Sequence, residues 1–339
     1  MKHAIAAATA VILASTVMPA SSAEVELRLA HWLPTTHPVQ PLGMDPWIES
    51  IRQASNGRIN ITVYPASQLG AAPDHYDMAR DGIAEITYTN PGYQAGRFPI
   101  YSLAEIPFHV TNAKSGAKAL HEWYAPLAET EMADVKFCLI NPHDPGTIHS
   151  KDPMKVPADI AGKNIRPAHA TMARFVSQLG GASVQVPAPE AREAITKGTA
   201  DAMTFPWNSI YIFGIDQATK HHLDMPFYIS SQMLLLNKPA YDAMSEQDRK
   251  VIDDHCTPEW SEKFSIGWAD NEYSGRQKML DSPDHTIHVP TAEEVQLWRD
   301  AAKPLLEAWR ADVVARGGDA DAIYSSYVDA LKRNNAFYE

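Results

Sequence analysis

The segment from Gly162 to Asn208 constrains the fold more than any other part of the 339-residue chain. Glycine and proline residues divide it into three short apolar stretches and two amphipathic runs. That spacing predicts strand, helix, strand, helix and strand, which is an α/β unit with Arg166 at the end of its first strand. The loop after the last strand holds Phe205, Trp207 and Asn208. Open α/β sheets bind their ligands at such strand ends.

Short motifs flank this segment in a regular order: Gly57-Arg58-Ile-x-Ile-x-Val-Tyr-Pro65, Gln68-Leu-Gly70, Asp81-Gly82-x-Ala-Glu85, Gly96-Arg-Phe-Pro99 and Asn237-Lys-Pro-Ala-Tyr241. In order and spacing the chain resembles the solute-binding subunits of TRAP transporters, the tripartite ATP-independent periplasmic carriers of organic acids, often called the C4-dicarboxylate-binding family. The resemblance spans nearly the whole chain after residue 23. It implies a two-domain α/β periplasmic-binding-protein fold, type II-like, with hinge strands joining the domains and one long helix spanning both.

The chain begins with Met1-Lys2-His3, an apolar run from Ala4 to Val17, and small residues before Ala23. This order is typical of a secretory signal peptide, which we predict to cover residues 1–23. Its removal leaves 316 residues and, because Lys2 is lost, changes the formal net charge from −12 to −13. An acidic chain without a basic stripe is not expected to bind nucleic acid. No other apolar run approaches the ~20 residues needed to cross a bilayer, so we expect no direct membrane insertion.

Chains longer than roughly 250–300 residues divide into domains, so two are expected here. A first β-α-β-α-β unit ends at a Pro/Gly cluster over residues 141–146, and the second unit follows it. The pattern of residues 232–237 is a strand that, by the resemblance, rejoins the first domain. We therefore predict one domain from residues 24–145 plus 231–275, and a second from residues 146–230 plus 276–339.

Thr257 and Pro258 fit an N-cap followed by proline in the first turn of a helix. If this helix continues to Leu280, it is the long spanning helix of the family, although Gly267 and Gly275 each weaken a helix interior.

Cys138 and Cys256 are the only cysteines of the chain. An exported protein permits a disulfide between them, and two separate buried thiols fit the sequence at least as well, because pairing depends on Cα positions.

Arg166 is the strongest candidate for ligand binding. Pro167 keeps it extended at the end of an element, and its planar guanidinium matches a carboxylate with two parallel hydrogen bonds. The arginine at this motif position grips the substrate carboxylate in the family, so the resemblance implies that role here. An ion pair with an acidic neighbour such as Glu190 is the alternative. Gly146 stands where sialic-acid-binding relatives carry a second arginine, which argues against a sialic acid.

Aromatic walls and one amide would enclose and orient a small organic acid, which predicts ligand contacts for Phe205, Trp207 and Asn208. Packing in the core is the alternative for the two aromatic residues. On the first-domain side, Trp32 and Asn90 fall at positions that resemble ligand-facing positions of the family, each just after a strand.

His31, His37, His143 and His149 lie near these loops, and each is a weaker candidate that could hydrogen-bond a hydroxyl or a second carboxylate. We include His31 and His149 in the predicted site, although a lone histidine is more often structural. The adjacent pair His221-His222 cannot share one metal ion simply, because neighbours in a strand point to opposite faces. Thr204-Phe205 replaces the glutamate–tryptophan pair beside the cation of keto-acid-binding relatives. We predict no metal and no cofactor.

The resemblance implies a periplasmic, non-catalytic protein that closes two domains around a small organic acid. It would deliver that acid to the small and large membrane subunits of a TRAP permease, and we expect it to be a monomer. One arginine, several aromatic residues and no second cationic clamp favour a monocarboxylate with an apolar or aromatic body; a C4-dicarboxylate is the alternative. A binding protein for an ATP-driven importer or chemoreceptor would share such a cleft. An exported hydrolase is the competing enzyme class, although no Gly-x-Ser-x-Gly or zincin motif is present.

Overall fold

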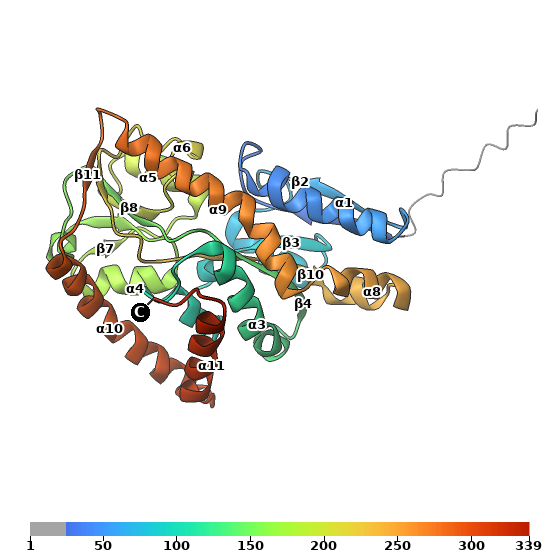
Figure 1. Ribbon diagram of the computed structural model, residues 1–339. Coiled ribbons are helices and arrows are strands. Elements are labelled where there is room, and N and C mark those ends of the chain that lie inside the picture. The colour runs from blue at the N-terminus through green and yellow to red at the C-terminus, as the bar shows by residue number, and fades with distance from the viewer. Residues whose placement is uncertain (1–24, 339) are drawn as a thin grey trace, which may run out of the picture.

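The computed structural model describes residues 25–338, arranged as two β-sheets with helices packed around them (Figure 1). The predicted signal peptide lies outside the described residues. Between the two sheets the chain crosses three times: from β4 to β5, from β9 to β10, and along the long helix α9 toward β11. The elements at these crossings are β4 (Val135–Pro142), β5 (Thr147–Ser150), β9 (His221–Leu223), β10 (Ser231–Asn237), α9 (Pro258–Leu280) and β11 (Thr286–His288).

The first sheet has five strands in the order β2-β1-β3-β10-β4. Its strand β1 runs parallel to both β2 and β3, and β10 runs antiparallel to β3 and β4. The predicted return of residues 232–237 to this sheet is therefore observed. The other strands of this sheet are β1 (Val25–Ala30), β2 (Ile59–Tyr64) and β3 (Ile86–Thr89).

The second sheet has six strands in the order β11-β9-β5-β8-β6-β7. Strand β6 is parallel to β7 and β8, whereas β5 is antiparallel to β8 and β9. The predicted strand–helix–strand–helix–strand unit forms its β6–β8 portion. The other strands of this sheet are β6 (Asn164–Arg166), β7 (Ala182–Ser183) and β8 (Ala202–Phe205).

Helices cover both sheets, and short helical turns fill several connections. The other α-helices are α1 (Asp45–Ala54), α2 (His75–Arg80), α3 (Ala113–Glu131), α4 (Ala170–Gln178), α5 (Ala191–Thr196), α6 (Ser209–Ile212), α7 (Lys238–Asp242), α8 (Glu246–Asp254), α10 (Ala292–Ala315) and α11 (Ala320–Arg333). The turns are η1 (Gln40–Met44), η2 (Ala72–Asp74), η3 (Pro91–Tyr93), η4 (Tyr101–Glu105), η5 (Pro157–Ile160) and η6 (Ala188–Glu190).

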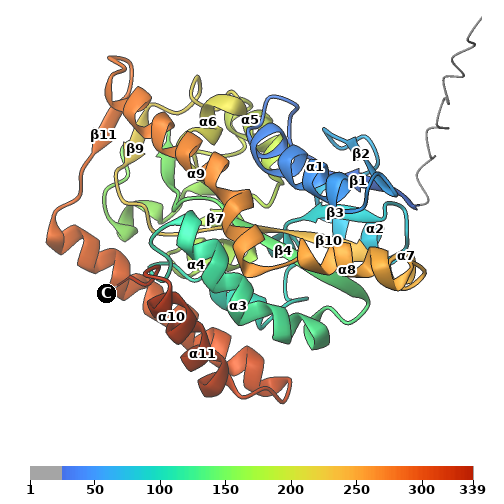
Figure 2. The same ribbon diagram turned by 45° about the vertical axis from the view of Figure 1, so that its right-hand side comes forward.

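The long helix α9 begins where its N-cap predicts and continues to Leu280. The Thr257 side chain accepts a hydrogen bond from the N–H of Trp260, and Pro258 occupies the first turn. The helix contacts α3, β4 and η1 near the first sheet, and α6 and β11 near the second, so it crosses both halves of the molecule (Figure 2). Its two interior glycines have a packing role, because a Cβ on Gly267 would lie 2.3 Å from Cβ of Leu42.

The C-terminal helices connect the two halves differently. Helix α10 packs against α4 and η5 near the second sheet and also against η4, whereas α11 packs against α3 beside the first sheet. The predicted division placed both helices with the second domain, and that boundary stays a prediction.

Candidate functional site

A small cavity lies where strand ends from the two sheets meet. Its volume is about 40 Å³, and its walls come from the segments after β1 and β3, from the ends of β6 and β8, from the start of β10, and from α9. The residues that line it are Trp32, Leu33, His37, Asn90, Tyr93, His143, Arg166, Ala168, Ala188, Phe205, Pro206, Ser209, Phe213, Tyr228, Ser230, Gln232 and Trp268. Four of the eight predicted site residues are among them.

Arg166 is the charged group of this cavity and is only 2% exposed. Its Nε donates to the carbonyl of Val186 (3.0 Å), and one terminal nitrogen donates to the carbonyl of Thr204 (3.3 Å). Within residues 25–338 it forms no ion pair, so the alternative salt bridge with Glu190 is not present. A buried charge without a counter-ion costs several kcal/mol. The site is therefore arranged to receive an anion.

Aromatic rings line the cavity that holds this guanidinium. The Phe205 ring lies 5.2 Å from the guanidinium carbon, within the range of a cation–π contact. Trp32 is fixed by a hydrogen bond from its Nε1 to the carbonyl of Tyr88 (3.0 Å), and its ring lies beside that of Tyr93 (5.8 Å between centroids). Flat apolar walls around one cation suit a carboxylate attached to an aromatic or apolar body.

Asn90 lines the cavity and also caps the turn η3. Its side-chain oxygen accepts a hydrogen bond from the N–H of Gly92 (2.9 Å), which fixes the amide at the end of β3. The amide –NH₂ is the part of Asn90 that remains for a ligand. The resemblance to the family pointed to this position, and its place after a buried strand explains why it reaches the strand-end cavity.

Trp207 and Asn208 do not line the cavity, because α9 holds this loop. The buried carboxylate of Glu272 accepts hydrogen bonds from the backbone N–H groups of Asn208 (2.5 Å) and Ser209 (3.2 Å). The Asn208 side chain donates to Asn271 on the same helix. Trp207 packs its ring against the imidazole of His149, 5.2 Å away. Sequence reasoning placed the loop correctly at a strand end but could not see which of its faces α9 covers.

The two predicted histidines also lie outside the cavity lining. His149 joins a row of three imidazoles, with Nδ1 2.7 Å from Nδ1 of His222, whose Nε2 is 2.8 Å from Nδ1 of His285. Burial lowers the pKa of His149 to about 3 and that of His31 to about 4, so both rings are neutral. The His31 Nε2 pairs with the Gln40 side chain (3.1 Å). Both histidines have structural partners. Among residues 25–338, no group of three His, Cys, Asp or Glu side chains could hold a metal ion.

His37 and His143, the other two histidines near these loops, do line the cavity. Burial lowers the pKa of His37 to about 3 and that of His143 to about 4, so neither supplies a positive charge at neutral pH. His143 is satisfied on both nitrogens, by the carbonyl of Asp144 (2.5 Å) and the N–H of Ser230 (2.9 Å). Arg166 is therefore the single cationic group of the lining.

Several cavity residues escaped sequence reasoning. Trp268 belongs to a helical aromatic stripe that predicts a core position, and Gln232 belongs to a strand whose pattern indicates burial. Tyr93 lies in the loop after β3, and its hydroxyl accepts a hydrogen bond from the N–H of Ala188 (3.1 Å), across the junction between the two halves. Only the three-dimensional crossing of α9 and β10 brings these side chains to the strand ends.

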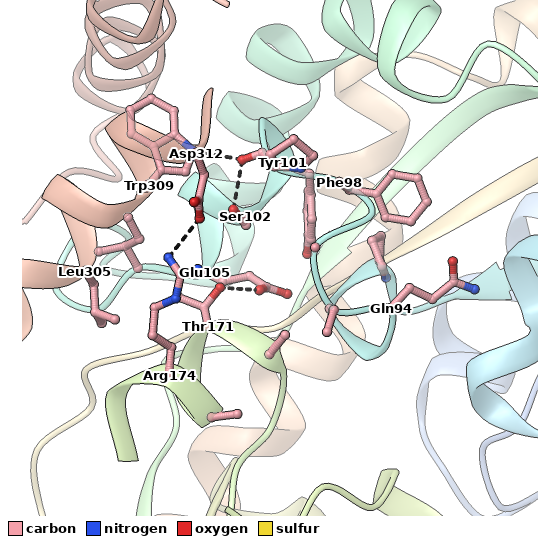
Figure 3. Close-up of a pocket in the computed structure, with 18 of the residues that line it drawn as sticks. Gln94, Phe98, Tyr101, Ser102, Glu105, Thr171, Arg174, Leu305, Trp309 and Asp312 are labelled. Carbon is pink, nitrogen blue, oxygen red and sulfur yellow. Dashed lines mark hydrogen bonds and ion pairs between the residues drawn. The ribbon is translucent and has the colours of Figure 1, made fainter. Parts of the chain in front are cut away.

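A second, larger cavity lies on the other side of η3 (Figure 3). It measures about 670 Å³ and is bounded by η3, η4, α4 and α10. Arg174, on its wall, is paired with Asp312 at 2.9 Å, and both side chains are about half exposed. Glu105 is buried there, and burial raises its pKa to about 8. Thr171 donates to this carboxyl group at 2.8 Å. Arg316, the other arginine of the lining, is exposed and donates to the carbonyl of Gly96 (2.7 Å). The charged side chains of this cavity thus have solvent or a partner to stabilise them.

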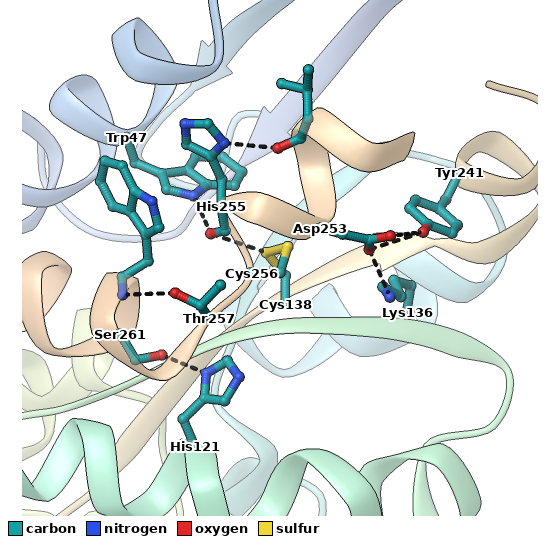
Figure 4. The surroundings of a disulfide bond; sticks show 12 residues. Trp47, His121, Lys136, Cys138, Tyr241, Asp253, His255, Cys256, Thr257 and Ser261 are labelled. Carbon is teal, nitrogen blue, oxygen red and sulfur yellow. Dashed lines mark hydrogen bonds and ion pairs between the residues drawn. A yellow bond between two sulfur atoms is a disulfide. The ribbon is translucent and has the colours of Figure 1, made fainter. Parts of the chain in front are cut away.

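A disulfide fixes the helix that forms one wall of the small cavity. Cys138 on β4 is bonded to Cys256, two residues before α9, with the Cα atoms 4.4 Å apart (Figure 4). The sequence left this pairing open. Beside it, the carbonyl of His255 accepts from the indole of Trp47 (2.8 Å). The segment just before α9 is therefore tied both to β4 and to α1.

Two α/β halves, three crossings between them and a strand-end cavity with one buried arginine define a solute-binding protein of the two-domain type. Residues 29–312 match the family described as bacterial extracellular solute-binding protein, family 7. The chain belongs to this family. None of the helices within residues 25–338 has the length and apolar character to cross a membrane.

Solved structures agree with this assignment, and curated proteins are similar over most of the chain. A TRAP solute-binding protein from Rhodoferax ferrireducens T118, in complex with copurified benzoate, is 29% identical with a TM-score of 0.86, over 92% of this chain and 98% of that chain. Another from Bordetella bronchiseptica, with bound (R)- and (S)-mandelate, is 28% identical with a TM-score of 0.85, over 91% and 99%. The outer membrane transporter protein TsaT of Comamonas testosteroni is 24% identical over 91% of this chain and 92% of that protein. The predicted TRAP solute-binding class and two-domain fold are confirmed.

Proposed function

We propose that this protein captures an aromatic monocarboxylate in the small cavity, with the ligand carboxylate on Arg166 and its ring between Trp32 and Phe205. The observation that carries the proposal is the buried guanidinium that has carbonyl partners but no counter-ion. A bound carboxylate supplies that counter-ion through charge-assisted hydrogen bonds. Asn90 completes the predicted contacts through its amide –NH₂.

The cavity chemistry favours one carboxylate over two. Arg166 is its single cation, because the pKa values of His37 and His143 are held far below neutrality by burial. A second carboxylate would lose its hydration without gaining a charged partner. The Rhodoferax and Bordetella proteins, which hold benzoate and mandelate, have ligands of this class. The C4-dicarboxylate alternative lacks a second clamp among the lining residues.

We further propose that the two domains close around the ligand. The connections from β4 to β5 and from β9 to β10 would bend, and the Tyr93–Ala188 hydrogen bond, present in this structure, would break on opening and form again on closure. Closure follows from tighter binding to the closed state, and it excludes water from the ion pair. The closed protein, a periplasmic monomer, would then deliver the acid unchanged to the two membrane subunits of a TRAP permease.

Isothermal titration of the chain without residues 1–23 tests this proposal. The panel contains benzoate, phenylacetate, succinate and malate, and ligand-free protein is prepared by unfolding, dialysis and refolding. We expect an aromatic monocarboxylate to bind at least tenfold more tightly than either dicarboxylate. Tighter binding of succinate or malate would show that the aromatic residues are core rather than walls. Absence of binding by every carboxylate would refute the proposed function.

A further inference from the structure

Two cavity residues at the start of β10 carry polar groups that have no partner. Ser230 is 4% exposed and Gln232 is 3% exposed, and both line the small cavity. The Ser230 hydroxyl and the Gln232 side-chain carbonyl form no hydrogen bond within the described part of the chain. Residues two apart in extended backbone face the same side. These two side chains therefore present a joint polar surface to the cavity.

The backbone around them is well paired, so the unpartnered groups do not reflect a loose segment. The N–H of Ser230 donates to His143 (2.9 Å), and its carbonyl accepts from the His143 N–H (3.2 Å). Asn141 lies opposite Gln232 in the β10–β4 register, and its amide donates to Ser265 (2.8 Å) and accepts from Tyr88. The amide on the adjacent strand is thus satisfied, whereas the side-chain carbonyl of Gln232 is not.

An unpartnered buried amide or hydroxyl lowers stability, because it loses hydration without a replacement. Fixed polar groups of this kind are retained where a ligand completes their hydrogen bonds. A hydroxyl donates one hydrogen bond and accepts two, and an amide both donates and accepts. Neither group is charged. The unpartnered atom of Gln232 is a carbonyl oxygen, which only accepts, so its complement must carry a donor. A ligand hydroxyl fits both groups, because it can donate to Gln232 and accept from Ser230, whereas a second carboxylate cannot donate.

We propose that Ser230 and Gln232 form a specificity subsite that hydrogen-bonds a hydroxyl group on the body of the bound acid. This inference rests on the proposed function, since Arg166 must first hold the carboxylate. It narrows the ligand class to aromatic monocarboxylates with a hydroxyl substituent. A site built to hydrogen-bond such a hydroxyl rejects the analogue without it, because its buried groups then stay unpaired.

Matched pairs of acids test the subsite by isothermal titration. The pairs are benzoate against its three monohydroxy derivatives, and phenylacetate against mandelate. We expect the wild-type protein to bind at least one oxygenated member about tenfold more tightly than its parent acid. Gln232→Leu should reduce that ratio to about one while leaving the affinity for the parent acid within about threefold. Ser230→Ala should reduce it partly. Gln178→Leu, at an exposed position of α4, is the matched control and should keep the wild-type ratio.

Thermal unfolding of the ligand-free proteins separates a binding role from a structural one. A glutamine that supports the fold would lower the melting temperature when replaced. The subsite predicts the reverse for Gln232→Leu, a rise of about 1–3 °C, because an unpartnered amide is exchanged for an apolar group of similar size.

The outcomes are distinguishable from failure of the proposed function. If benzoate or phenylacetate binds and no oxygenated derivative binds more tightly, the subsite is refuted and the proposed function stands. A preference that survives in both Gln232→Leu and Ser230→Ala also refutes the subsite. If no acid binds at all, both proposals fail together.

Discussion

The two cavities of this protein differ in a way that volume alone does not reveal. The larger, about 670 Å³, has two arginines that solvent reaches: Arg174 is half exposed and paired with Asp312, and Arg316 is exposed. The smaller, about 40 Å³, has an arginine that is buried, has no ion pair and lies against the Phe205 ring. Compensated charges need no ligand, whereas a buried and uncompensated charge does. The state of the polar groups therefore locates the binding site better than the size of the space.

The largest expected effect comes from replacing one arginine in each cavity and comparing the two losses of affinity. Arg166→Ala should weaken binding of the preferred aromatic acid by about 1000-fold, which corresponds to about 4 kcal/mol. Arg174→Ala, at the large cavity, should change the affinity less than about twofold, because its exposed ion pair contributes little. Isothermal titration measures both. Arg166→Lys keeps the charge and controls for misfolding. The comparison fails if Arg174→Ala weakens binding as much as Arg166→Ala.

Removing the disulfide tests whether α9, which forms one wall of the small cavity, needs this covalent bond to keep its position. Replacing Cys138 and Cys256 together by serine opens a loop closed over a separation of 118 residues. Loss of such a cross-link typically costs about 2–4 kcal/mol. We expect that decrease in the unfolding free energy from urea titration, with ligand affinity unchanged within about threefold. A large loss of affinity would show that α9 needs its disulfide to position Trp268.

Glu105 allows a pH test of the large cavity. Its carboxyl lies 3.2 Å from Nδ1 of His169, and this nitrogen also accepts from the N–H of Met172 (3.2 Å). His169 is neutral, because burial lowers its pKa to about 3, so a protonated Glu105 would donate to it. The pKa of Glu105 is about 8, raised chiefly by burial. Protonated Glu105 therefore contributes to the free energy of unfolding. This contribution is fully present below the unfolded pKa of 4.5 and is lost as the pH rises through the folded pKa of about 8.

Glu105→Gln should remove this dependence, because an amide can donate to His169 without titrating. Between pH 5 and pH 8 the wild-type protein should lose on the order of 2 kcal/mol relative to the variant. Thermal melts of both proteins across this range measure the difference, and effects of other titrating groups cancel. Parallel curves would mean that Glu105 titrates normally. The affinity for the aromatic acid should be the same in both proteins, since the small cavity does not include Glu105.

The contrast between the two cavities also shows what sequence could supply. Arg166 was identifiable because it precedes Pro167 at a strand end, and both strand-end and helix-cap patterns have local signals. The orientation of Trp207 had none, because Glu272 on α9 fixes that loop from 64 residues away. The role of Gln232 could not be predicted either. The sequence of a buried strand does not show whether a protein group or a ligand forms the hydrogen bonds of a polar residue in it. Long-range crossings, rather than local propensities, assembled those parts of the site.

The smallest effect is expected where α9 approaches the loop of the small cavity. A Cβ on Gly275 would lie 2.3 Å from Cα of Asn208, a backbone atom that cannot yield cheaply. Gly275→Ala gains about 1 kcal/mol of helix propensity but must push the loop away, which costs about 1–3 kcal/mol. We expect a net loss near 1 kcal/mol in urea unfolding and a few-fold weaker affinity for the aromatic acid.

Ser274→Ala, an exposed position on the same helix, is the control and should leave the affinity unchanged. If Gly275→Ala instead stabilises the protein at full affinity, the loop is not held by this close approach. The hydrogen bonds from the loop to Glu272 would then be sufficient to place Phe205 and Ser209 in the wall of the small cavity. The large cavity, whose walls exclude α9, should be unaffected in either case, because its lining comes from η3, η4, α4 and α10.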